Sequence, residues 1–507
     1  MSSTTEPTES RVRTYGNWRR PRSRGLLGMQ LPATILLLAA LMTAFVLMAL
    51  TLYLPALIVA VSAVVVVWAL STTDKHDVSV ATKLRTRTRW WAARSRGENL
   101  YRSGPLGRSL WGTHQLPGLL ASTRLSEHRD AYDRPFALLY SPTTSTATVV
   151  IEAEPEGSAL VDADQVDRWV AQYGNWLAAL GENPSVVAAS VTIEAEPDSG
   201  SSLRNELDER LQPDTASPFS LQVAKEILLS YPTGATRVTA YMAVTVRTTS
   251  VTGRRRKLED VAIDLAAQMP GLTQSLEATG LAAAVPVSAQ RLCEVVRVAY
   301  DPVVSEVIDQ ARARGESLEM SWPDVGPSAH QANWASYQHD SGYSQTWQMS
   351  IAPRGHVQSS VLRRLLAPHP DIARKRVTLM YRPIDPGRAA AIVEADRATT
   401  RYRAGARRTD IASSRDLTEV AAADRTAQEE AEGAALLHFG MLVTATVTDP
   451  EMIRRAAEAV NGLAATARLR LRPAYGAQAA AFAAALPLGQ LLNRQLAAPT
   501  QMSWDLS

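Results

Sequence analysis

The chain has 507 residues, with 53 lysines and arginines against 50 aspartates and glutamates, 46% hydrophobic residues and a single cysteine, Cys293. One cysteine excludes an internal disulfide framework and a cysteine-based zinc cluster, and the length provides for about two to four domains. The near-neutral total hides an asymmetry, because residues 1–110 carry 15 basic and 5 acidic residues. The sequence therefore predicts a basic N-terminal region joined to a mildly acidic body.

Residues 25–73 contain no charged residue, and two apolar blocks, 31–50 and 52–70, lie within this stretch. A block of about 20 residues is long enough to cross a hydrocarbon core of roughly 30 Å. We therefore predict a tight two-helix transmembrane hairpin over residues 31–70, with its turn near Thr51 to Pro55. A signal peptide is the alternative for a single apolar block, but here a second block follows at once.

Basic residues flank this hairpin on both sides, and its turn carries no charge. By the positive-inside rule, we expect a cell (inner) membrane protein with two spans and both termini in the cytoplasm. The alternative is a DNA-contacting patch in which tryptophans stack on bases, but binding to membrane lipid is favoured. The residues assigned to membrane anchoring and topology, called the basic collar below, are Arg19, Arg20, Arg22, Arg24, Arg85, Arg87, Arg89, Trp18, Trp90 and Trp91.

Composition divides the chain into five predicted segments, and the last two form a cytosolic body. These segments are a basic cytosolic N-terminus (1–30), the hairpin (31–70), a basic juxtamembrane linker (71–125), a first module (126–315) and a second module (316–507). The predicted fold class is α+β, with about two α+β modules and mixed or antiparallel sheets.

Alternation of apolar and polar residues marks the strands of the first module, and 3-4 spacing marks its helices. The sequence IEAEP occurs at 151–155 and again at 193–197, each time at the end of a predicted strand, which suggests a β-α-β unit. The predicted strands are 136–140, 147–153, 186–195 and 237–247, and the predicted helices are 162–181, 200–212, 217–230 and 257–268.

The second module continues the same alternation of strands and helices. Asp385-Pro386 and Asp449-Pro450 are typical helix starts, because aspartate caps the first N–H groups and proline fits the first turn. Predicted strands are 332–339, 343–352, 376–382, 436–447 and 469–472, and predicted helices are 357–367, one from 385, a long helix or helical hairpin within 405–435, and 450–466.

Sequence motifs for nucleotide binding and for common catalytic sites are missing. A phosphate-binding loop requires lysine after glycine, and none of the five lysines follows glycine. The patterns G-x-G-x-x-G, G-x-S-x-G and H-E-x-x-H do not occur either. We therefore predict no catalytic residue, no cofactor, no metal site and no enzymatic activity.

Three weaker signals have simpler explanations. Asp162 and Asp164 form the D-x-D pattern that nucleotide-sugar transferases use for a divalent metal, but both stand at a predicted helix start, where acidic residues are favoured. His339, Asp340 and Ser341 are adjacent, yet successive strand residues point to opposite faces and cannot form a triad. The spacing of four histidines matches no ligand pattern: His330, His339, His356 and His369.

Five phrases of the chain are distinctive, at 14–28 (TYGNWRRPRSRGLLG), 100–108, 116–121, 132–139 and 165–181. They resemble an actinobacterial family of two-span membrane proteins that accompany type IV secretion-like conjugation systems. Phrases at 381–386 (YRPIDP), 433–451 and 479–489 (AAAFAAALPLG) are similar to the N-terminal, non-motor region of VirB/TraC-type secretion ATPases. The predicted hairpin resembles the PrgI-type protein that partners such ATPases.

This resemblance implies a non-enzymatic, membrane-anchored scaffold that docks a separate hexameric VirB/TraC-type ATPase. Other secretion-channel membrane proteins and a second copy of the chain are further implied partners, and contact with DNA is a less favoured one. Two alternatives stay open at this point. One is an EccE-like component of type VII secretion, and the other is a membrane-bound glycosyltransferase that uses Asp162 and Asp164.

Overall fold

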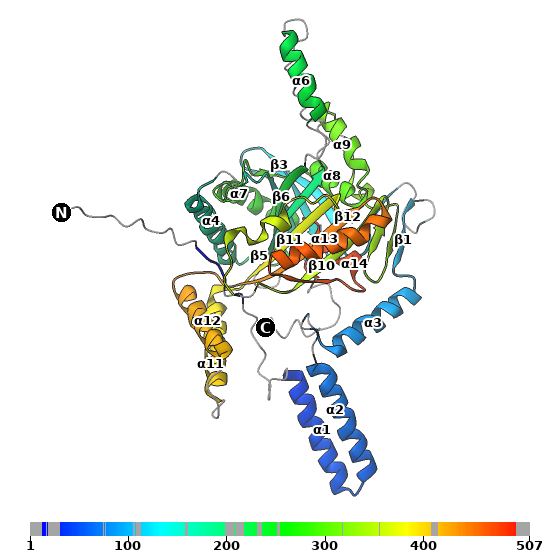
Figure 1. Cartoon of the computed structure of the whole chain (residues 1–507), viewed down its shortest axis with the longest axis vertical. Helices are drawn as coiled ribbons and strands as arrows, with labels where there is room; N and C mark the ends of the chain where they lie inside the picture. Colours follow the sequence, from blue (N-terminus) through cyan, green and yellow to red (C-terminus); the bar gives the residue numbers. More distant parts are fainter. Residues whose placement is uncertain are drawn as a thin grey trace, which may run out of the picture.

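The computed structural model describes residues 13–492 apart from 17, 19–30, 73, 75, 77, 105–106, 108–112, 158–160, 198–206, 208–216, 231–235, 251–253, 317, 354 and 407–413. A large sheet forms the centre of the molecule, and helices cover both of its faces (Figure 1). Helical segments project from this body at both ends of its long axis (Figure 1).

The first half of the sheet is a split β-α-β fold. Its neighbouring strands follow the order β7-β4-β6-β5, so β4 and β5 run parallel with β6 between them. The β-α-β unit that the IEAEP repeat suggested is therefore present, with α4 as its crossover helix. The elements are β4 (Thr146–Ala153), α4 (Ala163–Glu182), β5 (Val186–Pro197), β6 (Thr236–Arg247), α7 (Leu258–Glu277) and β7 (Val285–Pro286).

The second half repeats this topology, with the strand order β13-β10-β12-β11. The last strand of each half, β7 or β13, also pairs at the equivalent position of its neighbour. Ile151 of β4 lies opposite Pro286 of β7, and Trp347 of β10 lies opposite Pro473 of β13. The chain is thus an internal structural duplication. The elements are β10 (Gly342–Ile351), η5 (Ser359–Leu362), α10 (Arg363–Leu366), β11 (Arg374–Pro383), β12 (Leu437–Val447), η6 (Pro450–Met452), α13 (Ile453–Thr466) and β13 (Arg470–Pro473).

Strands β5 and β11 pair antiparallel and join the two halves into one sheet, in the order β1-β8-β9-β10-β12-β11-β5-β6-β4-β3-β2. We call this β5–β11 pair the seam. The two predicted modules therefore share a single sheet, and its recorded strand pairs are all antiparallel. The outer strands are β1 (Leu100–Arg102), β2 (Arg124–Arg129), β3 (Pro135–Ser141), β8 (Ala329–Ala332) and β9 (Tyr337–His339).

The two faces of the sheet differ in character. One face is apolar and packs against α4 and α7 in the first half and against α13 in the second. The opposite face, called the polar face below, carries threonine, serine and charged side chains around a smaller apolar core. Helices α8 (Ala289–Tyr300) and α14 (Gln478–Ala485) cover the polar face, and each follows the last strand of its half.

Each half also carries a helical insertion between the same two strands of its fold. Helix α6 (Pro218–Ser230) lies between β5 and β6, and the hairpin of α11 (Pro386–Ala406) and α12 (Ser414–Ala431) lies between the equivalent strands β11 and β12. Figure 1 shows α6 and the α11–α12 hairpin extending from opposite ends of the body. The remaining short elements are α9 (Val304–Ala313), η3 (Gly118–Leu120) and η4 (Trp322–Asp324).

The N-terminal helices correct the membrane prediction. Helices α1 (Leu31–Ala49) and α2 (Tyr53–Ser71) pack as a pair, and α3 (Val80–Ser95) follows them. Each of the first two has 19 residues. Within the residues that the structure describes, no helix is long and apolar enough to cross a membrane. The predicted transmembrane hairpin and the two-span location in the inner membrane are therefore wrong.

Smaller differences separate the predicted elements from the observed ones. The strand predicted at 332–339 is the hairpin β8–β9, because Asn333 N donates to Ser336 O and closes a turn. The helix predicted at 357–367 is reduced to η5 and the four-residue α10. The predicted linker 71–125 contains α3 and β1, and the helix predicted at 200–212 lies outside the described residues apart from Leu207.

Candidate functional site

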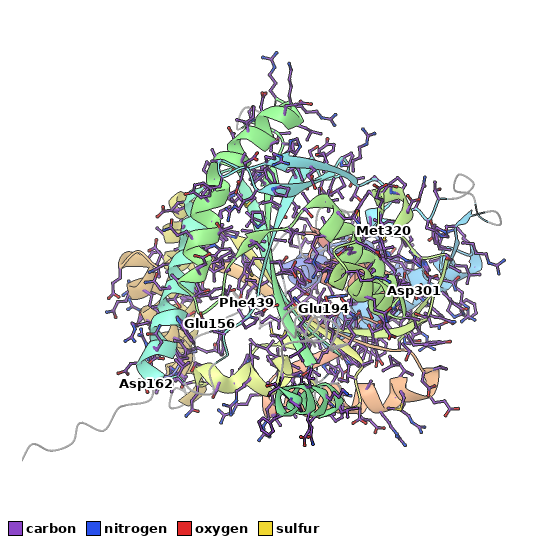
Figure 2. All side chains as sticks on the ribbon, turned by 90° about the horizontal axis from the view of Figure 1, so that it is seen from above. Glu156, Asp162, Glu194, Asp301, Met320 and Phe439 are labelled. Atoms are coloured by element: carbon purple, nitrogen blue, oxygen red, sulfur yellow. The ribbon has the colours of Figure 1, made fainter. Side chains whose placement is uncertain are left out.

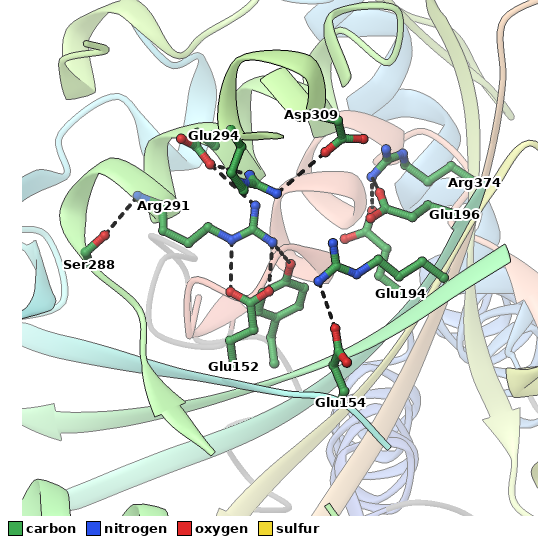
Figure 3. Close-up of polar contacts among 12 residues, drawn as sticks. Glu152, Glu154, Glu194, Glu196, Ser288, Arg291, Glu294, Asp309 and Arg374 are labelled. Carbon is green, nitrogen blue, oxygen red and sulfur yellow. Dashed lines mark hydrogen bonds and ion pairs between the residues drawn. The ribbon is translucent and has the colours of Figure 1, made fainter. Parts of the chain in front are cut away.

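The two IEAEP sequences place four glutamates on the polar face at one edge of the sheet. Glu152 and Glu154 alternate along the end of β4, and Glu194 and Glu196 do so along the end of β5. Because side chains two residues apart point to the same face of a strand and the two strands run parallel, all four approach one another. Figure 3 shows them with Arg291 of α8 and Arg374 of β11.

Arg291 of α8 forms the first part of this charged cluster. Its Nε lies 2.9 Å from one Glu152 carboxylate oxygen and its Nη2 lies 2.7 Å from the other, a bidentate pair (Figure 3). Nη2 also lies 3.2 Å from the Tyr241 hydroxyl. Burial alone would raise the pKa of Glu152, but the hydrogen bonds and charge of Arg291 outweigh it and lower that pKa. The pair thus attaches α8 to β4 and β6.

The seam forms the second part. Glu194 of β5 accepts from Arg374 at 2.9 Å and from Arg376 at 2.7 Å, both on β11. All three side chains are buried. Burial opposes ionisation of Glu194, yet the two guanidinium groups lower its pKa. One row along the sheet, the hydroxyls of Thr192 and Thr378 lie 3.1 Å apart. The two halves are therefore joined by a buried charge group as well as by backbone hydrogen bonds.

The rim of the cluster is more exposed. Arg312 of α9 pairs with Glu294 of α8 and lies 3.5 Å from Asp309. Glu196 pairs with Arg374, but burial and the neighbouring Glu194 charge raise the pKa of Glu196 despite that arginine. Glu154 pairs with Arg237 at 2.8 Å.

Ion pairs between glutamate and arginine make up the charged cluster. Its carboxylates are each engaged by arginine, and arginine does not give up its proton near neutral pH. Among the described residues, no group of three or more histidine, cysteine, aspartate or glutamate side chains could hold a metal ion. The sequence analysis did not predict a role for Arg291, Arg374 or Arg376. A single charged residue on an otherwise apolar strand or helix does not indicate which residue it pairs with.

Asp162 and Asp164 lie apart from this cluster. Both are exposed, and Figure 2 shows Asp162 at the periphery while Glu194 lies near the centre. Helix α4 begins directly after Asp162, as predicted, but the Asp162 side chain makes no capping hydrogen bond. Only the backbone oxygen of Asp162 accepts, from Gln165 N at 3.0 Å and Val166 N at 3.1 Å. The expected side-chain cap is therefore wrong there, whereas Asp449 does cap, accepting from Glu451 N at 2.9 Å.

The neighbouring residues His339, Asp340 and Ser341 bond to different partners, but strand alternation is not the reason, because Asp340 and Ser341 form the turn between β9 and β10. His339 is fully buried, with Nδ1 2.6 Å from the Tyr300 carbonyl oxygen and Nε2 2.7 Å from Ser344 Oγ. Burial lowers the pKa of His339 to about 4, so its ring is neutral at pH 7. Asp340 instead accepts from the backbone N–H of Ser328 at 2.8 Å.

The structure describes part of the basic collar. Arg19, Arg20, Arg22 and Arg24 lie outside the described residues. Arg85, Arg87, Arg89, Trp90 and Trp91 all lie on α3, and their side chains are exposed except for the half-buried Trp90. Trp18 lies near the start of the described chain and is 36% exposed.

Two contacts attach the N-terminal region to the body. Tyr15 exchanges backbone hydrogen bonds of 2.8 Å with Val357 of the second half, and its hydroxyl donates to Asp167 of α4 in the first half at 2.7 Å. Trp90 packs edge-on against Trp334 with ring centroids 5.3 Å apart. Tyr15 and the Trp90 side of α3 are therefore attached to the folded body.

The segment that follows α14 lies directly on the polar face. Thr378 donates to Ala485 O at 2.7 Å, and Thr245 donates to Gly489 O at 3.3 Å. Gly489 has φ +60°, and a Cβ there would lie 2.1 Å from Thr245 Oγ1. The LPLG phrase at 486–489 is thus a close-packed strap across the sheet. Comparison of the sequence with protein-family models and with curated proteins gave no match.

Proposed function

We propose that this chain is a non-catalytic docking scaffold of a conjugation-type secretion apparatus and that it binds a separate VirB/TraC-type ATPase. The observation that carries the proposal is the pair of helical insertions between equivalent strands of the duplicated sheet, β5–β6 and β11–β12. A rigid sheet with one helical extension per half suits the presentation of binding surfaces, since loops and insertions on a stable framework commonly carry function. The resemblance of 381–386, 433–451 and 479–489 to the non-motor region of such ATPases supports the choice of partner.

The α11–α12 hairpin is the better candidate for the docking element. Ala389, Val393 and Ala423 are buried, and Asp424 accepts from both Arg397 and Arg401 at 2.8 Å. These contacts hold the two helices together as one projecting unit (Figure 1).

The far end of this hairpin exposes apolar side chains. Tyr402, in the last turns of α11, is 76% exposed, and Leu417, in the first turn of α12, is 58% exposed. Exposed aromatic and aliphatic side chains at the tip of a fixed element are the usual anchors of a protein interface. We refer to these two residues as the hairpin tip.

Helix α6 offers a second surface. Phe219, Val223 and Ile227 recur every four residues, so they form one stripe, and each is at least 36% exposed. A stripe of this kind fits the apolar face of a partner helix.

Titration of the purified full chain with a VirB/TraC-type ATPase from the same organism tests the proposal. We expect saturable binding by the wild-type chain. In the double variant Tyr402→Ala/Leu417→Ala the affinity should fall by 10-fold or more, which is about the effect of removing one anchor residue from an interface. Tyr132→Ala is the matched control, because Tyr132 is 70% exposed in the β2–β3 turn, outside the α11–α12 hairpin. No binding of the wild-type chain, or equal loss in the control, would contradict the proposal.

A further inference from the structure

Helix α3 is a cationic surface with no internal counter-charge. Residues 80–95 contain five basic residues and no acidic residue. Lys83 pairs with Asp74 at 2.7 Å, and the guanidinium of Arg94 lies 5.2 Å from the ring centroid of Trp90. The three remaining basic side chains, Arg85, Arg87 and Arg89, are exposed and have no ion-pair partner among the described residues.

The two adjacent tryptophans of α3 have different roles. Trp90 faces the body, where Trp334 lies against it and stacks in turn on Tyr475 at a centroid distance of 5.5 Å. Successive helical residues are about 100° apart, so Trp91 points away from this contact. Trp91 is 70% exposed, which leaves a large indole in solvent beside the arginines.

Arg87 and Trp91 are four residues apart and therefore share one side of the helix, while Arg85 and Arg89 share another. An extended polyanion lying along α3 would meet guanidinium groups on both sides of the exposed indole. Guanidinium groups bind phosphates, and an aromatic ring stacks on an unpaired base. Base pairs in a duplex are already stacked and do not offer this second contact.

We infer that α3 binds single-stranded nucleic acid, with Arg85, Arg87 and Arg89 on the phosphates and Trp91 stacked on a base. Trp90 acts only as a positioning residue, since its packing against Trp334 fixes the direction in which Trp91 points. The inference rests on α3 alone and holds whether or not the chain docks an ATPase. A polyanion without bases would use the arginines but not the indole, which separates the two kinds of ligand.

Fluorescence anisotropy of a labelled oligothymidine with the full chain tests this inference. With three phosphate contacts, the logarithm of the association constant should fall linearly with the logarithm of the salt concentration. The expected slope is about −2 between about 50 and 200 mM salt. The double variant R85E/R87E removes two of them, so its slope is expected to fall to about −0.7 and its affinity by more than about 10-fold. Trp91→Ala is expected to lower affinity about 5-fold or more with the slope unchanged.

The double variant R363E/R364E is the matched control, because it makes the same charge change on two exposed arginines of α10. We expect its affinity to stay close to that of the wild type. Thermal unfolding of all variants shows whether they fold alike. An equal loss in R363E/R364E would overturn the inference, and so would wild-type affinity in Trp91→Ala. Binding to vesicles of anionic phospholipid with none to the oligonucleotide would also overturn it, in favour of a lipid surface.

Discussion

The two halves of the sheet share one topology but fill the polar face in different ways. In the first half, Glu152 and Arg291 place a charge pair between the sheet and α8. Hydroxyl pairs lie on the polar face in both halves. In the first half, Thr148 lies 2.9 Å from Thr245. In the second half, Ser344 lies 2.7 Å from Thr446, and Thr346 lies 3.0 Å from Thr444. The alanine-rich α14 covers these small side chains. Between the halves, Glu194 and Glu196 of β5 pair with arginines of β11. Arg297 of α8 also lies 3.2 Å from Asp340 of the second half.

This difference shows how a duplicated fold acquires a unique assembly. Hydroxyl pairs and alanine allow close packing but discriminate little between alternative registers. A buried charge group such as Glu194 with Arg374 and Arg376 discriminates strongly, because any shift leaves a charge unpaired at high cost. We therefore expect the seam to be the most sensitive position in the sheet.

Glu194→Gln at the seam should give the largest effect. It leaves Arg374 and Arg376 buried without their shared carboxylate, so the free energy of unfolding is expected to fall by about 3–5 kcal/mol. Urea denaturation measures the loss. Glu154→Gln is the control, because the Glu154 side chain is 60% exposed and its pair with Arg237 should contribute about 1 kcal/mol or less. Similar losses in both variants would remove the distinction between seam and rim.

Gly489→Ala should disturb the strap over the first half. The new Cβ would overlap Thr245 Oγ1 at a positive φ, which we expect to cost about 2–3 kcal/mol. Gly97→Ala separates the two causes, since Gly97 has φ +70° but no atom near its Cβ position. It should lose only about 1 kcal/mol in the same denaturation experiment. A smaller loss for Gly489→Ala than for Gly97→Ala would show that the strap does not lie on the sheet.

Trp90→Ala and Trp91→Ala compare the two sides of α3. Loss of the aromatic contact with Trp334 is expected to destabilise the protein by about 1–2 kcal/mol. The exposed Trp91 should change the free energy of unfolding by less than about 0.5 kcal/mol. Chemical denaturation checks both values, and the reverse order would mean that α3 is oriented differently.

Acid should weaken the second half through His339. The pKa of its imidazole is about 4 in the folded state and about 6.5 when unfolded, owing mainly to burial. Between these values the unfolded state binds the proton, so stability is complete above pH 6.5 and falls as the pH drops toward 4. Arg376, His330 and Asp301 are the charged or titratable groups that also act on this ring.

We expect His339 to contribute about 1 kcal/mol per pH unit in that window. Denaturant midpoints measured from pH 7 to 4.5 check it against His339→Gln, which should show a shallower decline. His128→Gln is the control, because His128 lies on the edge strand β2. An identical pH dependence in the wild type and His339→Gln would contradict the assignment.

Local sequence patterns predicted most of the elements but not their assembly. The alternation of apolar and polar residues predicted β4, β5, β6, β11 and β12. Each of these strands has a buried apolar face, so apolar residues recur at every second position. The duplication escaped detection, since Pro286 and Pro473 hold equivalent places while the residues around them differ. Split β-α-β strands pair with sequence-distant neighbours, and no local pattern encodes that choice. The hairpin at 31–70 shows the opposite failure, in which an apolar pattern predicted a membrane span that the described helices do not provide.

The candidate site was predicted only in part. The IEAEP repeat pointed to four glutamates and to the strand ends that place them together. Arg237 of β6, the partner of Glu154, is the nearest of their partners in the sequence. The other partners come from α8 and β11, more than 90 residues away from the nearest IEAEP sequence, and only the fold brings them close. Trp90 and Trp91 were grouped from the sequence, whereas the structure separates them by the direction in which each faces.

Hydrogen–deuterium exchange of the full chain, with and without a VirB/TraC-type ATPase, tests the docking claim most directly. The account predicts slower exchange in α11 and α12 near Tyr402 and Leu417 when the ATPase is present, with the seam strands β5 and β11 unchanged because they are already buried. Unaltered exchange throughout the chain at saturating ATPase, or protection confined to the α8–β4 charged cluster, would contradict it.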